Sequence, residues 1–232
     1  MAMKRKAESA LVVTVLLIGR AAFAQEPYMP ATGPSGSGES EASGLELGVR
    51  VGYGVPLGSA AQNANWSDLI KGMVPFWADV GYRIDPNWYV GGFFQFGLGF
   101  VPSNLCASGL SCSENDLRFG LNVHYHLLPH ETFDPWIGIG AGYEIWNYSV
   151  SAAGVSGSAQ LKGWEFGNAQ LGLDYKFSPT FGVGPFVSLT VAQFSDSSGS
   201  FSGVSVSGSI PNKTLHEWLI FGLRGVFDLT FD

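Results

Sequence analysis

The chain has 232 residues, of which 13% are charged and 14% are aromatic, and it carries a formal net charge of −7 at pH 7. The acidic balance argues against a nucleic-acid partner. The low charge, the abundant rings and the absence of a long apolar helix favour a lipid-facing β-protein over a soluble enzyme, whose outer faces would carry more charge.

The N-terminus has the three-part layout of a secretory signal peptide. Residues 4–6 are basic, residues 10–18 are apolar, and residues 22–24 read Ala-Phe-Ala. The apolar run is too short to cross a bilayer as a helix, and Arg20 interrupts its far end. We therefore expect cleavage after residue 24, which leaves 8 basic and 18 acidic residues and a net charge of −10.

The segment 25–43 is rich in Gly, Ser, Pro and Glu, a composition that cannot bury a core and predicts a flexible leader. The remaining residues, 44–232, are expected to form one domain.

Within that domain, eight stretches alternate apolar residues with small or polar ones. In residues 117–127 the apolar and aromatic side chains share one face, and Arg118, Asn122 and His124 lie on the other. The expected strands are residues 45–55, 74–84, 88–100, 116–127, 135–148, 162–177, 181–194 and 215–229. In the sixth expected strand, the alternation of apolar and polar residues shifts near Trp164 and Phe166, which predicts a bulge there.

The connectors between these strands alternate strictly in length. Three are short (85–87, 128–134 and 178–180), and four are long and polar (57–73, 101–115, 149–161 and 195–214). The last two long connectors carry a weak alternation of apolar residues, which leaves open an extension of the strands beside them into a sheet that protrudes from the membrane. Outer-membrane barrels have short periplasmic turns and long extracellular loops. The pattern therefore predicts an all-β, eight-stranded antiparallel up-and-down transmembrane β-barrel, with both chain ends on the periplasmic side.

The polar phase of the strands carries both full charges and many glycines, which suit a crowded lumen. An exported soluble barrel with its apolar face inward is the competing interpretation. Its outer face would then carry the glycines, including Gly91, Gly97, Gly138 and Gly184, and small residues are poorly suited to an exposed face.

In this architecture the chain resembles the small eight-stranded outer-membrane barrels of the OmpA/OmpX type, over roughly residues 44–232. The resemblance implies a place in the bacterial outer membrane, contact with its lipids, and a C-terminal alternating segment that is read by the barrel-assembly machinery. The matching residues are Phe221, Leu223, Phe227, Leu229 and Phe231, although the chain ends on Asp232.

A barrel of eight strands is just wide enough for its own side chains to fill it, so inward charges should be paired. If Arg50 lies opposite Asp79, the same register sets Glu46 opposite Arg83; Arg118 opposite Glu144 sets His126 opposite Trp136. A barrel's shear allows these partners to shift by two residues. We predict a lumen ionic network of Glu46, Arg50, Asp79, Arg83, Arg118, Glu144, Arg224 and Asp228.

Cys106 and Cys112 have the spacing of a disulfide that closes a small loop, which would contribute about 2–3 kcal/mol. Metal binding by the two thiols is the weaker alternative, because no histidine lies close in sequence. No metal or cofactor is expected.

Aromatic residues near the strand ends are candidates for the two interfacial girdles. They are Trp88, Tyr125, Trp136, Tyr175 and Phe177 at the periplasmic end, and Tyr53, Phe76, Phe100 and Trp218 at the outer end. Trp77, Trp146 and Trp164 fall on the inward phase. His216 is the only histidine placed well for catalysis on lipid, and a solvated residue at the barrel rim is its plainer interpretation.

Three functions compete. The leading one is a structural or surface-interaction barrel, with a side-chain-filled lumen and a possible extracellular partner at the four long loops. The alternatives are a narrow pore or carrier for small or hydrophobic solutes and, as the least favoured, a lipid-modifying enzyme. We therefore expect a protein that is not an enzyme.

Overall fold

The computed structural model describes residues 43–152 and 154–230. The predicted signal peptide (1–24), the leader as far as residue 42, and Phe231 of the predicted assembly segment lie outside the described residues. Among the described residues, no helix is both long enough and apolar enough to cross a membrane.

Strands make up nearly all of the described chain. They are β1 (Gly44–Ala61), β2 (Ala64–Asn65), β3 (Met73–Arg83), β4 (Trp88–Gly99), β5 (Ser111–His126), β6 (Phe133–Ala152), β7 (Val155–Ser178), β8 (Phe181–Phe201), β9 (Val204–Ser209) and β10 (His216–Thr230). A short helix, α1 (Trp66–Leu69), follows β2.

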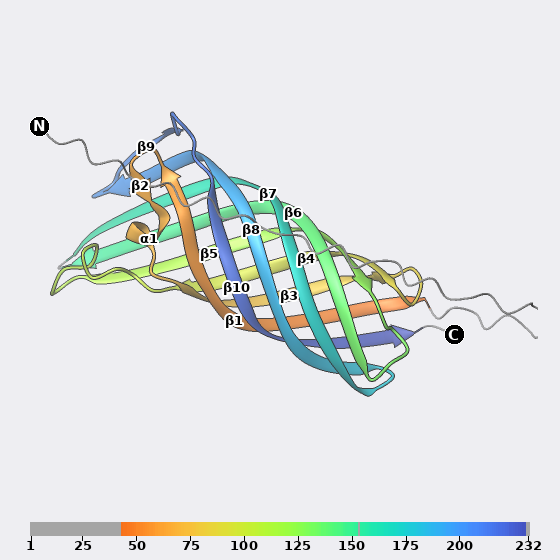
Figure 1. Ribbon diagram of the computed structural model, residues 1–232. Helices are drawn as coiled ribbons and strands as arrows, with labels where there is room; N and C mark the ends of the chain where they lie inside the picture. Colours follow the sequence, from red (N-terminus) through yellow and green to blue (C-terminus); the bar gives the residue numbers. More distant parts are fainter. Residues whose placement is uncertain (1–42, 153, 231–232) are drawn as a thin grey trace, which may run out of the picture. The chain divides into compact units, whose positions relative to one another are not determined.

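Eight of these strands pair antiparallel around a closed ring in the order β1, β3, β4, β5, β6, β7, β8 and β10 (Figure 1). The ring closes where β10 pairs with β1, from Gly44 opposite Thr230 to Gly58 opposite His216. Closure satisfies the backbone hydrogen bonds of every strand in the ring. The predicted eight-stranded antiparallel up-and-down barrel is confirmed.

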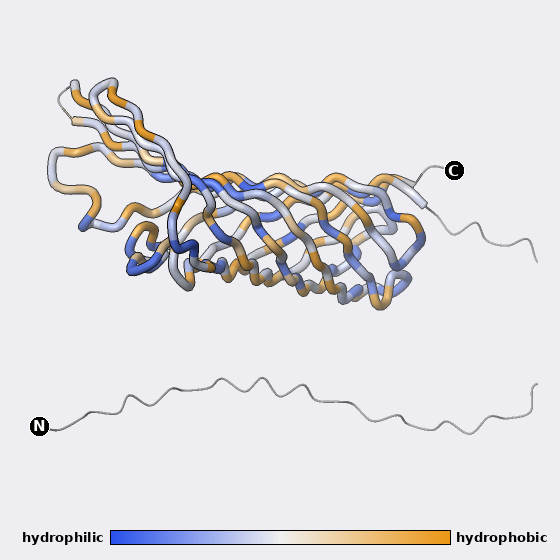
Figure 2. Tube along the Cα trace, turned by 90° about the horizontal axis from the view of Figure 1, so that it is seen from above, coloured by the Kyte–Doolittle hydropathy of each residue, from blue (hydrophilic) through white to orange (hydrophobic). Residues whose placement is uncertain are grey.

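The two phases of each strand face opposite environments. Leu121, Ile139 and Leu223 on the outer surface are exposed, whereas Glu46, Arg118 and Arg224 inside are buried. The alternation of hydrophobic and hydrophilic residues along the barrel wall can be followed in Figure 2. Because the apolar side chains point outward, the competing soluble barrel with an apolar interior is wrong.

The connections differ at the two ends of the barrel. Short turns join β3 to β4, β5 to β6 and β7 to β8, at the same end as the start of β1 and the end of β10. The opposite end carries β2, α1, β9 and the loop 100–110. This segregation follows the predicted order of short and long connectors.

Two of the four predicted long loops are largely strand. Residues 149–152 of β6 pair with residues 155–158 of β7, and residues 196–201 of β8 pair with β9. These strands project beyond the barrel at one end (Figure 2). Their Ser- and Gly-rich composition is typical of loops, but the weak alternation of interspersed valines had left a protruding sheet open, and the pairing shows that sheet.

The predicted bulge lies in β7, where the register with β6 and β8 shifts around residues 162–167. The shift turns Trp164 outward, to 61% exposure, and Glu165 inward, to 1%. The assignment of Trp164 to the inward phase was therefore wrong. At Trp164, the bulge reverses which side of β7 faces the lumen.

Two girdle assignments were also wrong. Trp136 and Trp218 are buried inside the barrel, whereas Trp88, Phe76, Phe100 and other girdle candidates are exposed. Both tryptophans share the strand phase of charged lumen residues, and this phase decides their orientation more strongly than the position near a strand end.

Candidate functional site

The interior of the barrel holds a set of charged side chains that are almost all buried. At the end with the short turns, Glu46 lies between two guanidinium groups: its Oε2 is 2.5 Å from Arg83 Nη2, and its Oε1 is 2.5 Å from Arg224 Nη2. Arg224 also pairs with Asp174, and Arg83 lies 3.4 Å from Asp228. Alternating signs in this cluster offset the cost of burying each charge.

A second cluster is centred on Arg50. Its Nε donates to Asp79 Oδ2 over 2.7 Å, and its Nη1 donates to Gln170 Oε1 over 2.6 Å. Asp79 Oδ1 accepts a further hydrogen bond from Asn122 over 2.9 Å. The guanidinium carbon lies 4.6 Å from the centre of the Trp77 ring, a cation–π contact.

A third cluster lies in the half of the barrel nearer the outer end. Arg118 donates through Nε to Glu165 Oε2 over 2.9 Å, and Glu165 also accepts from Asn168. Glu144 accepts from Trp218 Nε1 over 2.9 Å and lies 2.8 Å from His216 Nε2.

Helix α1 closes the outer end with an aromatic cluster, which we call the aromatic plug: Trp66, Trp146, Phe194, His216 and Trp218. The ring of Trp66 lies within 5.1–5.7 Å of each of the other four, and Trp66 is fully buried. Edge-on and tilted packing of this kind is favourable between aromatic rings. The plug covers the third charge cluster from outside.

All eight residues of the predicted ionic network lie in the interior, but not all of them pair as expected. The β5–β6 register places Arg118 opposite Glu144 as predicted, yet the charge partner of Arg118 is Glu165. The β1–β3 register is displaced by two residues, so Arg50 lies opposite Trp77. Arg50 and Asp79 still form their ion pair because long side chains reach diagonally across neighbouring strands.

Several interior residues were missed from the sequence: Asp116, Glu165, Gln170 and Asp174, together with Trp66 of the plug. The alternation of β7 places Gln170 and Asp174 between outward Leu171, Leu173 and Tyr175, so their phase was available. Glu165 was hidden by the bulge. Trp66 lies outside the strands of the ring, and no strand phase could place it.

The interpretation of His216 as a solvated residue at the barrel rim was wrong. It is fully buried, stacks on Phe194 with ring centres 4.2 Å apart, and is engaged by Glu144. It starts β10 on the same phase as Arg224, and the plug covers it.

Glu46, His124 and His126 bring three possible metal-ligand atoms within 4.8 Å of one another. Both oxygens of Glu46 are bound to arginines, and guanidinium nitrogens lie 3.4 Å from Nε2 of each histidine. A metal cation there would meet three positive charges. The group is therefore better described as part of the ionic network than as a metal centre.

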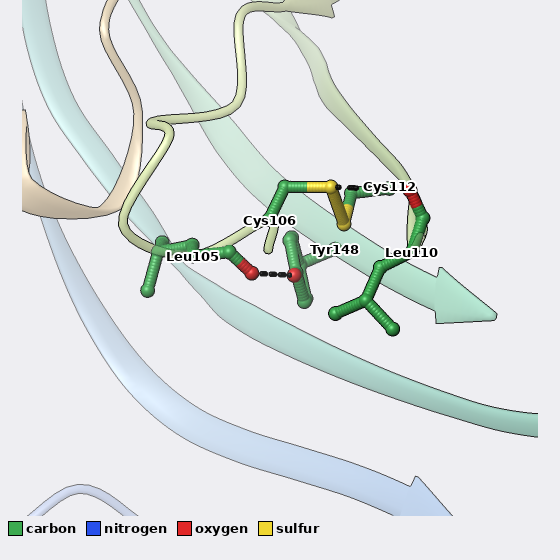
Figure 3. The surroundings of a disulfide bond; sticks show 5 residues. All are labelled: Leu105, Cys106, Leu110, Cys112 and Tyr148. Atoms are coloured by element: carbon green, nitrogen blue, oxygen red, sulfur yellow. Dashed lines mark hydrogen bonds between the residues drawn. A yellow bond between two sulfur atoms is a disulfide. The ribbon is translucent and has the colours of Figure 1, made fainter. Parts of the chain in front are cut away.

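Cys106 and Cys112 form a disulfide beside the start of β5 (Figure 3). The hydroxyl of Tyr148 donates to the Leu105 carbonyl over 2.8 Å, which fastens the same loop to β6.

No protein-family model matches the chain, and no curated protein matches it. Solved structures do. OprG from Pseudomonas aeruginosa is 15% identical, with a TM-score of 0.47, over 82% of this chain and 97% of that one. The outer membrane protein AlkL is 18% identical, with a TM-score of 0.48, over 88% and 99%. Most matched barrels are not described as enzymes, but the protease OmpT from Escherichia coli also matches, at 8% identity and a TM-score of 0.36 over 82% and 96%.

The physical construction of the barrel identifies its environment. A closed antiparallel ring leaves no strand edge in the membrane, its exterior is apolar, and its interior is charged and paired. This arrangement is stable only where lipid surrounds the outer face, and barrels of this kind belong to bacterial outer membranes. The chain is an outer-membrane β-barrel in contact with lipid.

Proposed function

We propose that this protein is a non-conducting barrel that holds an extracellular sheet at the cell surface as an interaction surface. Together, the three charge clusters and the aromatic plug are the observation that supports a closed lumen. Arg118, Arg224, Trp66 and Trp136 are all fully or almost fully buried inside a ring of eight strands. A ring of this size has little room beyond its own side chains.

The part of the molecule outside the barrel supports the second half of the proposal. Strands β6, β7 and β8 continue past the ring, and β9 adds to β8 there. A rigid strand extension presents side chains in fixed positions, which suits recognition better than a mobile loop. We place the function in this extension. We do not propose catalysis by His216, because its Nε2 contacts Glu144 and its ring is packed within the aromatic plug.

The C-terminal strand supports a role for the assembly machinery. Phe221, Leu223, Phe227 and Leu229 all lie on the exposed face of β10. We propose that the barrel-assembly machinery recognises these side chains during insertion. We also propose that an extracellular partner binds the strand extension.

Conductance in planar bilayers tests the closed lumen. We expect the mature protein to insert without steady openings, because opening a path would require several buried ion pairs to separate. The paired replacement of Arg118 and Glu165 by serine, combined with Trp66→Ala, should produce a measurable leak and so verifies that insertion is detected. Steady openings of the unaltered protein would favour the pore alternative.

A further inference from the structure

The strands that continue past the ring form one sheet, which we call the outer sheet. It consists of residues 111–115 of β5, 147–152 of β6, 155–162 of β7, 196–201 of β8, and β9. One face of this sheet continues the outer, lipid-facing surface of the barrel, and we call it the polar face. Beyond Lys162 and Asp196 at its base, it carries Ser111, Ser113, Asn115, Asn147, Ser149, Ser151, Ser156, Ser158, Gln160, Ser198, Ser200, Ser205 and Ser207.

Side-chain hydrogen bonds hold the polar face in a fixed arrangement. Gln160 Nε2 donates to Asn147 Oδ1 over 2.6 Å, and Asn147 Nδ2 donates to Asn115 Oδ1 over 2.9 Å. The hydroxyl oxygens of Ser158 and Ser200 lie 2.9 Å apart. Amides and hydroxyls have further donors and acceptors that these bonds do not use. The polar face is therefore an ordered array of neutral hydrogen-bonding groups, which loses little side-chain freedom when a ligand binds.

The polar face is hollowed rather than flat. One hollow of about 410 Å³ extends over β6, β7, β8 and β9, and its lining includes Asn147, Ser158, Gln160 and Ser207. A second hollow, of about 400 Å³, extends toward β5. Both volumes lie within the range of small-ligand sites, roughly 300–1,000 Å³. The polar face therefore offers room for ligand groups as well as hydrogen bonds.

The polar face begins at the level of the lipid head groups. On the same outward surface, just below it, lie Tyr143 and Trp164, whose ring centres are 5.2 Å apart. Aromatic rings on the outside of a barrel favour the boundary between hydrocarbon and head groups. The outer sheet also bends away from the barrel axis, which inclines its outward face toward the membrane surface (Figure 2). The head groups of the surrounding lipids are therefore the nearest ligands for this face.

The composition of the polar face separates the kinds of ligand. The centres of protein interfaces are rich in aromatic residues, Met and Arg and poor in Ser, which is the opposite of this face. Phosphate groups are bound by Arg and Lys, but the outer sheet has one basic residue, Lys162, and it lies opposite Asp196. Serine and amide side chains both donate and accept hydrogen bonds, as neutral sugar hydroxyls do. Sugar is therefore the head-group chemistry that this face fits.

We infer that the polar face binds the sugar head groups of glycolipids in the outer leaflet of the membrane. The inference rests on the proposed function, which places the outer sheet at the cell surface, and it identifies the partner. Hydrogen bonds from the serine and amide side chains replace part of the hydration of the sugar hydroxyls, and bridging waters supply the rest. The acyl chains of the same lipid contact the apolar wall of the barrel. This second contact keeps the sugars at a high local concentration beside the polar face.

Competition between two glycolipids tests the inference. The full-length mature protein in detergent micelles is mixed with equal amounts of lipid A and of lipopolysaccharide that carries unphosphorylated core sugars on the same lipid A. Native mass spectrometry measures how much of each lipid is bound. We expect about tenfold more of the lipid with core sugars, because several hydrogen bonds of modest strength add to its binding.

A triple variant locates the binding. Ser149→Ala, Ser158→Ala and Ser200→Ala remove neighbouring hydroxyls from one cross-strand row and should lower the preference to less than about twofold.

A matched control replaces as many serines at the same end of the molecule but away from the polar face. It combines Ser67→Ala in α1, Ser103→Ala in the loop 100–110 and Ser197→Ala on the opposite face of the outer sheet, and it should keep the preference. Heat-dependent migration on gels verifies that both variants are folded.

Two outcomes would overturn the inference: equal binding of the two lipids by the unaltered protein, or an unchanged preference in the triple variant of the polar face. Display of the outer sheet is measured separately, with trypsin added to whole cells, which should cut after the exposed Lys213 between β9 and β10. Cleavage at Lys213 without a preference for core sugars would reject the inference and leave the proposed function standing. Cleavage in broken cells alone would reject both.

Discussion

The pair formed by Arg118 and Glu165 is the clearest example of a buried ion pair across the strands. Both side chains are fully shielded from solvent. Arg118 also reaches Gln95 over 3.3 Å, but this neutral amide cannot balance its charge. The stability of the barrel therefore depends on an ion pair that strand register alone did not predict.

Glu165→Gln should lower the free energy of unfolding by about 3 kcal/mol, because it removes the carboxylate that forms an ion pair with the buried Arg118. The measurement is urea unfolding of the protein in lipid vesicles. Glu131→Gln, at an exposed acidic residue in a short turn, should change the free energy of unfolding by less than about 0.5 kcal/mol.

A third variant separates charge from packing. Replacing Arg118 by Met and Glu165 by Leu together removes both charges and should recover most of the lost stability, since well-packed apolar residues often replace buried ion pairs without loss. Equal destabilisation of the double variant and Glu165→Gln would contradict this account.

At the residue scale, the sequence predicted which side chains are inside wherever the period of two continues unbroken. The register of β5 with β6 was predicted correctly, including His126 opposite Trp136. Trp136 and Trp218 were misplaced because position near a strand end was weighed above phase. Glu165 was not predictable in the same way, since the position of a bulge depends on contacts with both neighbouring strands.

Helix α1 is the one helical element of the described chain, and its four residues are too few to be stable alone. Its position depends on Trp66, which packs among four rings from three strands of the ring. Packing of one side chain, not helix propensity, therefore holds this element in the barrel opening.

Trp66→Ala should release α1 from the opening without dismantling the ring. Loss of a buried tryptophan costs about 3–5 kcal/mol of local packing, which exceeds what a single helical turn can offset. Limited proteolysis of intact vesicles should then cut within residues 62–72, while the unaltered protein resists. Ser67→Ala, at an exposed position of the same helix, should keep that resistance.

At the element scale, the eight strands of the ring were predicted to within a few residues at their short-turn ends. At the outer ends, β3, β4 and β10 were also predicted to within one residue, whereas β1, β5, β6 and β8 extend further than predicted. Strand β7 begins at Val155, seven residues before the predicted start, and β9 lies in a connector that was left open between a loop and a protruding sheet. Serine and glycine lower the intrinsic strand preference, so only pairing with the neighbouring strand stabilises these extensions.

The whole molecule combines a rigid membrane part with a sheet and a loop outside it. The disulfide joins the loop 100–110 to β5 but links no two strands of the ring. Its effect should therefore remain local to the end of the barrel that lies opposite the short turns.

Replacing Cys106 and Cys112 by serine should leave the barrel folded. Folded barrels resist unfolding by detergent until heated, and this heat-dependent migration on gels should be unchanged. The loop should lose about 2–3 kcal/mol of constraint and become susceptible to proteases on the outside of vesicles. Loss of the folded gel band would show that the crosslink supports the ring itself.

At the scale of the molecule, the two unlike faces of the strands and the alternation of connector lengths together predicted the architecture. The sequence could not predict that the lumen would be closed by the aromatic plug, because Trp66 arrives from a connector whose path depends on tertiary packing. At residues 149–161 and 195–214, the sequence left the choice between a loop and a protruding sheet open.

The change of side-chain type along β6 and β7 has a further consequence, for the depth of the barrel in its bilayer. On the outward phase, Ile139 and Ile145 are followed by Asn147, Ser149 and Ser151. Hydrocarbon accommodates the isoleucines, but it would strip water from the amides and hydroxyls beyond them. The change from isoleucine to asparagine therefore marks where the hydrocarbon region of the bilayer ends. It opposes deeper insertion of the barrel and keeps the strand extensions outside the lipid.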